Sequence, residues 1–197
     1  PKDAFLINWI RQNGMEGEDA FRKAGDEGTQ VHIAIDQLIK GLAVPTVNMP
    51  AKVKRCVQSF IDWHTEFKPK VLETEKMVWN DEHRFAGTLD LKCELNYKKG
   101  KTVYEGIYTV DYKSSKSIHE RHKVQNAAYW KADGGVGGAA ILHLGNTTKV
   151  GYSFIDYDAE EMWKKFAYYA QGFWMEHPDA APNRITYPEQ FTLTAIF

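Results

Sequence analysis

The sequence is poor in cysteine. Its 197 residues include only Cys56 and Cys93, which lie far apart and form no Cys-x-x-Cys pair. Two thiolates are too few for a four-cysteine iron–sulfur cluster or a cysteine-built zinc site. Two free thiols in a reducing compartment are the more usual arrangement, although a single disulfide stays open. We therefore expect no iron–sulfur cluster.

Long apolar runs are also missing. No stretch of the sequence is long enough to cross a bilayer, and the first residues show no basic segment followed by an apolar signal core. The sequence therefore predicts no membrane partner and an intracellular protein, in the cytoplasm or the nucleoid.

Neither sign of charge is in excess. The chain has 25 basic and 26 acidic residues, for a net charge of −1. A protein that coats nucleic acid through bulk charge needs a basic surface, so this class is disfavoured. A nuclease is not excluded, because acids clustered at a metal site cancel basic residues elsewhere in the net count.

The length and the apolar content of 43% fit one domain spanning residues 1–197. We expect its core at about residues 26–177, with an N-terminal helix and a C-terminal tail after Pro178 as appendages. Apolar periodicity predicts a mixed α/β (α+β) fold, in which a central sheet is flanked by helices. The expected helices span 3–12, 26–41, 52–67, 117–131 and 158–177, and the expected strands span 71–79, 84–95, 102–113, 139–144 and 150–157.

Two acids and one amine fall on two strands that are expected to be neighbours. Asp90 ends the segment Gly87-Thr88-Leu89-Asp90, and Asp111 and Lys113 project from the same face of the next strand, because side chains alternate along a strand. An acid in each of two adjacent central strands is costly unless it is paired or bound to metal. A surface ion pair is the alternative interpretation of an isolated Asp-x-Lys.

These groups suit the hydrolysis of a phosphodiester. Asp90 and Asp111 can ligate one or two Mg²⁺ or Mn²⁺ ions, with the backbone carbonyl of Tyr112 as a further ligand. Lys113 can orient the attacking water and stabilise the phosphate oxygens. Glu75, on the preceding predicted strand, is a weaker candidate for an additional ligand or a supporting group.

The pattern resembles the PD-(D/E)XK nuclease superfamily and, within it, the RecB-like exonuclease branch. That branch has a histidine on an early helix, a Gly-x-x-Asp strand, an Asp/Glu-x-Lys strand and a Gln-x-x-x-Tyr helix. The matching residues of this chain, in the same order, are His32, Gly87 to Asp90, Asp111 to Lys113, and Gln125 with Tyr129. The resemblance implies a restriction-endonuclease-like core.

The resemblance also implies roles that spacing alone does not give. His32 by itself is more typical of a core or surface histidine, but the resemblance implies a metal ligand beside Asp90 and Asp111. Gln125 and Tyr129 lie one helical turn apart, and in this family such a pair supports the catalytic lysine and the substrate phosphate. An exposed amide and a packed ring are the alternative for that pair.

Basic residues follow the predicted Asp111–Lys113 strand end. Lys116, Arg121 and Lys123 lie at the start of the predicted helix that carries Gln125, where a helix N-terminus and cationic side chains together favour phosphates. A solvated charged face is the alternative interpretation.

We therefore expect a Mg²⁺- or Mn²⁺-dependent deoxyribonuclease that acts as an exonuclease on DNA ends or single strands. A structure- or sequence-specific endonuclease is one alternative, and a non-cutting nucleic-acid-binding module with a nuclease-like fold is another. The chain has no Gly-x4-Gly-Lys-Ser/Thr motif, so any helicase or recombination partner would be a separate chain. Recombination, repair and DNA processing in a phage-infected cell all stay open.

Overall fold

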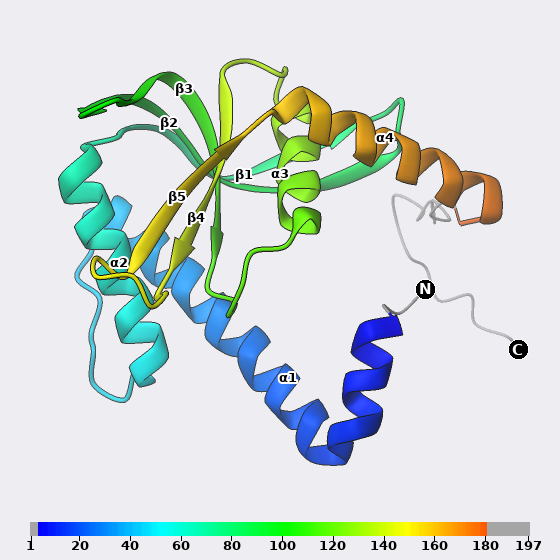
Figure 1. Cartoon of the computed structure of the whole chain (residues 1–197), viewed down its shortest axis with the longest axis horizontal. Helices are drawn as coiled ribbons and strands as arrows, with labels where there is room; N and C mark the ends of the chain where they lie inside the picture. The colour runs from blue at the N-terminus through cyan, green and yellow to red at the C-terminus, as the bar shows by residue number, and fades with distance from the viewer. Residues whose placement is uncertain (1–3, 181–197) are drawn as a thin grey trace, which may run out of the picture.

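The computed structural model describes residues 4–180 and has a mixed α/β fold, as the sequence predicted (Figure 1). A five-stranded sheet is flanked by four helices within these residues. The elements in chain order are α1 (Ala4–Ile39), α2 (Ala51–Phe67), β1 (Lys70–Asn80), β2 (Phe85–Lys99), β3 (Thr102–Lys113), α3 (Glu120–Ala132), β4 (Gly138–Leu144), β5 (Tyr152–Tyr157) and α4 (Ala159–Glu176).

The strands lie in the sheet in chain order, β1-β2-β3-β4-β5. The first three form an antiparallel meander, as expected from the short turns between them. β3 then pairs in parallel with β4, and β4 pairs antiparallel with β5. The parallel step requires a crossover, which α3 supplies. β3 is therefore the central strand, with a partner on each side.

The helices cover opposite faces of the sheet, and β4 shows how. Leu142 and Leu144 join the apolar cluster beneath α1 and α2, whereas Ala139 joins the cluster beneath α3 and α4. Odd and even residues of a strand project to opposite faces, so the two helix pairs sandwich the sheet. Trp63 of α2 is the largest buried side chain of the first cluster, and Trp130 of α3 and Trp163 of α4 are the largest of the second.

The prediction of two separate N-terminal helices was wrong. Residues 4–39 form one helix, α1, which runs through the glycine-punctuated segment expected to interrupt it, and Figure 1 shows it bent rather than broken. A glycine costs a helix only about 1 kcal/mol, and extension of an existing helix is close to neutral. Buried Val31 and Ile35 anchor the C-terminal part, and an Asp19–Arg22 ion pair of 2.6 Å supports the middle.

The expectation that the aromatic stripe of α4 is core holds only for its first half. Met162 and Trp163 are buried, but Tyr169 is 58% exposed and Phe173 is 43% exposed. The helix continues past the edge of the sheet (Figure 1), and of its later turns Trp174 packs on the β1–β2 turn, where its Nε1 donates to the His83 carbonyl at 3.0 Å. Helical periodicity alone does not reveal where the supporting sheet ends.

Two further expectations concern the chain as a whole. Within residues 4–180, no helix combines the length and the apolarity that a membrane span needs. The C-terminal tail predicted after Pro178 lies almost entirely outside the described residues.

Candidate functional site

Asp90 and Asp111 lie where two central strands separate. The β2–β3 ladder runs from Lys99 paired with Thr102 up to Leu91 paired with Val110, and it stops there. Asp90 and Asp111 are the next residue on each strand. Beyond this point β3 keeps its partner β4, so the gap opens only on the β2 side.

The carboxylate of Asp90 occupies the gap. Its Oδ2 accepts a hydrogen bond of 2.7 Å from the backbone N–H of Tyr112, which would otherwise lack a strand partner on that side. Asp90 is 8% exposed and Asp111 is 3% exposed. The two predicted acids are therefore buried at one break in the sheet, as their neighbouring strands suggested.

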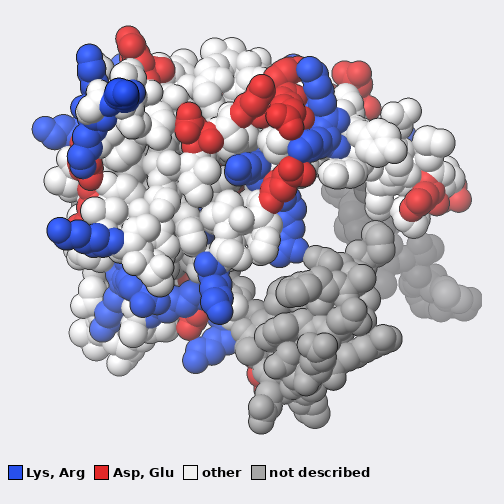
Figure 2. Space-filling view, in the orientation of Figure 1, with Lys and Arg blue, Asp and Glu red and all other residues white. Residues whose placement is uncertain are grey.

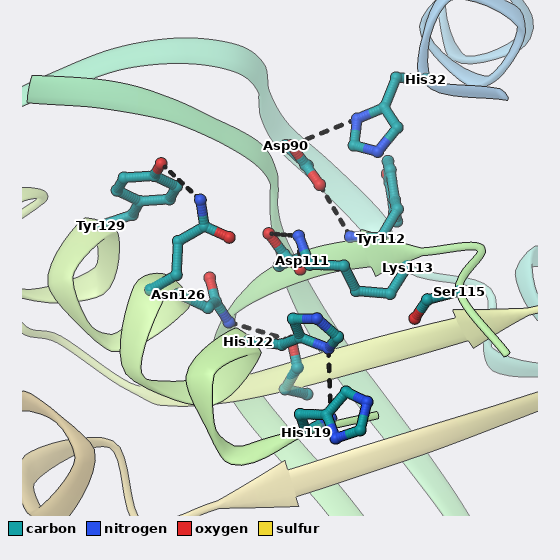
Figure 3. A network of polar contacts seen from close by, with 12 residues as sticks. His32, Asp90, Asp111, Tyr112, Lys113, Ser115, His119, His122, Asn126 and Tyr129 are labelled. Atoms are coloured by element: carbon teal, nitrogen blue, oxygen red, sulfur yellow. Dashed lines mark hydrogen bonds and ion pairs between the residues drawn. The ribbon is translucent and has the colours of Figure 1, made fainter. Parts of the chain in front are cut away.

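Two more predicted residues reach Asp90 from other elements. His32 of α1 places Nδ1 3.4 Å from Asp90 Oδ1 and 3.9 Å from Glu75 Oε1 of β1. One ligand atom from each of His32, Glu75 and Asp90 lies within 4.8 Å of the others. Figure 3 shows the His32 ring approaching Asp90 from the α1 side. Side chains from α1, β1 and β2 thus converge on one point.

An irregularity in β1 places Glu75. A β-bulge lies between Val71 and Glu73, and Glu75 then adopts a left-handed backbone with φ of 47°. A left-handed conformation costs a non-glycine residue of order 1 kcal/mol or more and persists only where its surroundings enforce it. One support is a hydrogen bond of 3.2 Å from the Thr74 hydroxyl to Asp36 of α1. Strain at a potential ligand is typical of a functional site.

Lys113 contacts Asp111 directly. Its Nζ donates to Oδ1 at 2.9 Å and lies 2.7 Å from Oδ2, although Oδ2 accepts no hydrogen bond of good geometry from the described residues. Burial, followed by the negative charge of Asp90, raises the pKa of Asp111 to about 7 despite this ammonium. Asp111 therefore takes up a proton near neutrality unless additional positive charge reaches it.

The other two acid–base groups respond to the same field. Burial alone would lower the pKa of His32, but the hydrogen bond and charge of Asp90, with Asp111 and Glu75, outweigh burial and raise it. Burial and then the charge of Asp90 raise the pKa of Glu75. Both pKa values are raised because several acids lie together without enough cations, and this arrangement favours the binding of a metal ion.

The donor set fits a divalent cation. Carboxylate oxygens suit Mg²⁺ and Mn²⁺, and the imidazole of His32 favours the transition metal of the two. Among the side chains that the structure describes, the mutually close donors are His32, Glu75 and Asp90, and Asp111 lies outside that group. Glu75, the weakest candidate from the sequence, is thus among the best placed. The roles of Asp111 and of the Tyr112 carbonyl as ligands stay predictions.

The predicted Gln125–Tyr129 pair lies on α3 beside β2. Gln125 Nε2 donates to the Tyr129 hydroxyl at 3.1 Å, and the amide is exposed while the ring is half-buried. The Tyr129 ring packs directly on Gly87, where any Cβ would collide with it. The glycine of the Gly87–Asp90 segment therefore has a packing reason in this chain, since it lets α3 approach the strand that carries Asp90.

Two residues that the sequence did not single out also shape the site. Asn126 is buried, and its Nδ2 donates to the carbonyls of Thr109 at 3.2 Å and Ala140 at 3.1 Å, which locks α3 over β3 and β4. His143 of β4 is in register with Lys113. Each is a polar residue inside an apolar segment, and that pattern could have marked both.

The predicted nucleic-acid contacts differ in their surroundings. Lys116 and Arg121 are exposed beside the end of β3, whereas Lys123 is half-buried with Nζ 5.8 Å from the ring centroid of Tyr157 in β5. Figure 2 shows Lys and Arg side chains in several groups on this face, one of them over its lower part, around α2, the β4–β5 turn and the β3–α3 connection. Lys123 is thus the least available of the three.

No protein-family model matches the chain, and no curated protein is significantly similar to it. The nuclease resemblance therefore rests on this chain's own residues and their geometry.

Proposed function

We propose that the chain is a metal-dependent DNA exonuclease that hydrolyses phosphodiester bonds. The observation that carries this proposal is the break between β2 and β3, where buried Asp90 and Asp111 meet Lys113 at 2.7 Å from Asp111. Two buried acids at one break, with the lysine paired to Asp111 alone, are a poor structural arrangement, because each acid raises the cost of ionising the other. The arrangement suits a reaction that develops negative charge on phosphate.

The proposal gives each residue a task. His32, Glu75 and Asp90, with Asp111 beside them, would hold Mg²⁺ or Mn²⁺. The bound cation would supply a Lewis acid for the phosphoryl oxygen and lower the pKa of a water. Asp111 holds the Lys113 ammonium at the edge of the site, where it orients the attacking water and neutralises a phosphate oxygen. Tyr129 and Gln125 close the wall beside Asp90.

The preference for DNA ends or single strands comes from the RecB-like resemblance. A structure- or sequence-specific endonuclease would use the same residues, so the product decides between the two. The proposal includes an intracellular setting and, for unwinding or recombination, a helicase or other partner on a separate chain.

The test is degradation of end-labelled linear DNA and of closed circular DNA with Mg²⁺ or Mn²⁺. We expect linear DNA to be shortened from its ends, circles to be spared, and chelation to stop the reaction. Lys113→Ala should lower the rate at least about 100-fold, as expected for the loss of charge stabilisation at the reacting group. Asp111→Ala should abolish it, whereas exposed Lys98→Ala and Asp81→Ala, the matched controls, should cut normally.

Each other outcome selects an alternative. Cutting of circles would replace the exonuclease with an endonuclease. DNA binding without cutting under either metal would leave the non-cutting binding module, which should keep its affinity in Lys113→Ala. Cutting that survives Asp111→Ala would place the chemistry elsewhere and refute the proposal.

A further inference from the structure

His122 presents a hydrogen-bond donor at the start of α3. The helix begins after its N-cap residue His119, and His122 is its third residue. The backbone N–H of His119 donates to His122 Nδ1 at 3.3 Å. A nitrogen that accepts a hydrogen bond carries no proton, so the ring hydrogen lies on Nε2. Nε2 has no hydrogen-bond partner among the described residues.

The ring lies next to the proposed catalytic lysine. In Figure 3 it lies between the Asp111–Lys113 pair and His119, on the side of Lys113 away from His32. Burial, and then the positive charges of Lys113 and Arg121 with nearby His119 and His143, lower the pKa of His122 to about 4. The imidazole is therefore neutral at pH 7 and faces a positive field, which favours an anion over a cation.

The segment that surrounds His122 is fixed by its own hydrogen bonds. His143 Nε2 lies 2.7 Å from the Ser115 carbonyl, which can only accept, so His143 donates and holds the β3–α3 connection against β4. Ser115 Oγ donates to the Ser117 carbonyl at 2.8 Å, and Ser117 Oγ lies 3.0 Å from His119 Nε2. His143 is a positioning residue, and the donor of His122 is held in place before any ligand arrives.

The first turn of α3 adds no unpaired acid at this point. Glu120, the one acid in the first turn of α3, accepts instead from Lys165 of α4 at 2.8 Å. Lys116 and Arg121 are exposed at the same end of the helix. The imidazole of His122, the side chain of Lys116 and that of Arg121 thus lie at one end of α3, beside Lys113.

We propose that the Nε2–H of His122 binds the DNA phosphate next to the scissile one. This inference rests on the proposed function, because it assumes that the scissile phosphate lies at Asp90, Asp111 and Lys113. It adds a binding subsite on the far side of Lys113 from His32. The DNA backbone would then run from the His32 side of the site, past Lys113, to the first turn of α3.

His122 also has a structural role as a helix cap, and substitutions can separate this role from the proposed binding of phosphate. Glutamate and glutamine at the third helical position both accept from the N-cap N–H, so His122→Glu and His122→Gln keep the cap. Glutamine also keeps an N–H donor, whereas glutamate replaces it with a negative charge that repels phosphate. His122→Ala loses both features, and exposed His177→Ala is the matched control.

The experiment measures binding of a short fluorescent single-stranded oligonucleotide with Ca²⁺ in place of the active metal, together with thermal unfolding of each variant. We expect His122→Gln and His177→Ala to bind within about twofold of the wild type. His122→Ala should bind about fivefold more weakly, the loss typical of one hydrogen bond, and His122→Glu at least about tenfold more weakly. The melting temperature of His122→Glu should equal that of the wild type.

A second probe identifies the phosphate. Neutral methylphosphonate links, placed one at a time along the oligonucleotide, should weaken wild-type binding at one flanking link, and the same link should have no effect on His122→Ala. Two results would refute the subsite. One is binding of His122→Glu with wild-type affinity, and the other is an equal loss of affinity in the wild type and His122→Ala at every link. Cutting assays in Mg²⁺ are scored separately. Cutting with normal binding in the variants rejects the subsite alone. Variant-sensitive binding without cutting rejects the nuclease, and with it a scissile phosphate, and leaves His122 as a phosphate-binding residue. A wild type that neither binds nor cuts rejects both.

Discussion

Asp111→Asn should make the protein more stable at alkaline pH while it abolishes cutting. In the folded chain burial and Asp90 raise the pKa of Asp111 from its ordinary 3.8 to about 7. The folded state therefore keeps a proton between about pH 4 and pH 7 that the unfolded state has released. The free energy of unfolding must fall as pH rises through that window. Below it, Asp111 is neutral in both states and contributes no pH dependence.

The difference between 3.8 and about 7 corresponds to a loss of roughly 4 kcal/mol at 1.36 kcal/mol per pKa unit. The protein around Asp111 relaxes when the carboxylate ionises, and asparagine leaves Lys113 without its ion-pair partner, so the net change is smaller. We therefore expect the free energy of unfolding of Asp111→Asn, relative to the wild type, to increase by about 2 kcal/mol from pH 4 to pH 8.

Urea unfolding of both proteins at pH 4 and pH 8, with EDTA present, measures this change. The comparison cancels the titration of groups that lie far from Asp111, whereas His32, whose pKa the charge of Asp111 helps to raise, contributes part of the difference. Added Mn²⁺ should then stabilise the wild type at pH 8 and leave Asp111→Asn much less affected, because a cation compensates the ionised carboxylate. If the two proteins differ by the same free energy at both pH values, Asp111 does not titrate as a buried, repelled acid, and the electrostatic argument for the site fails.

Two further substitutions test the construction of the site. Gly87→Ala should lower the free energy of unfolding by about 1–3 kcal/mol, measured in urea, and should slow cutting, because the new methyl group displaces the Tyr129 ring from β2. Its control is Gly172→Ala, because Gly172 is exposed and its new methyl group meets no neighbouring atom. Glu75→Gly should raise the free energy of unfolding by about 1 kcal/mol, because glycine accepts φ of 47° without strain, yet weaken Mn²⁺ binding measured by calorimetry. A Glu75→Gly protein that is less stable, or that binds Mn²⁺ normally, would contradict the assignment of strain or of metal binding.

The sequence by itself determined the order of the elements and the identity of the acids. The hairpin turn at residues 98–101 predicted the strand that became β3 with the same bounds, and the alternation of side chains along a strand placed Asp111 and Lys113 on one face. Local patterns suffice there because a strand's periodicity depends only on which face is buried. The same logic misjudged α1 and the second half of α4, where helix continuation and the extent of the sheet depend on distant packing.

Only the tertiary structure decided how the candidate groups meet. The end of the β2–β3 ladder at Leu91 and Val110, the left-handed Glu75 and the approach of His32 to Asp90 arise from contacts between segments far apart in the chain. The ring tautomer of His122 follows from the way one helix begins. Such features depend on backbone geometry and on distances of a few ångströms, whereas the sequence specifies which residues are available and the face of the strand or helix on which they lie.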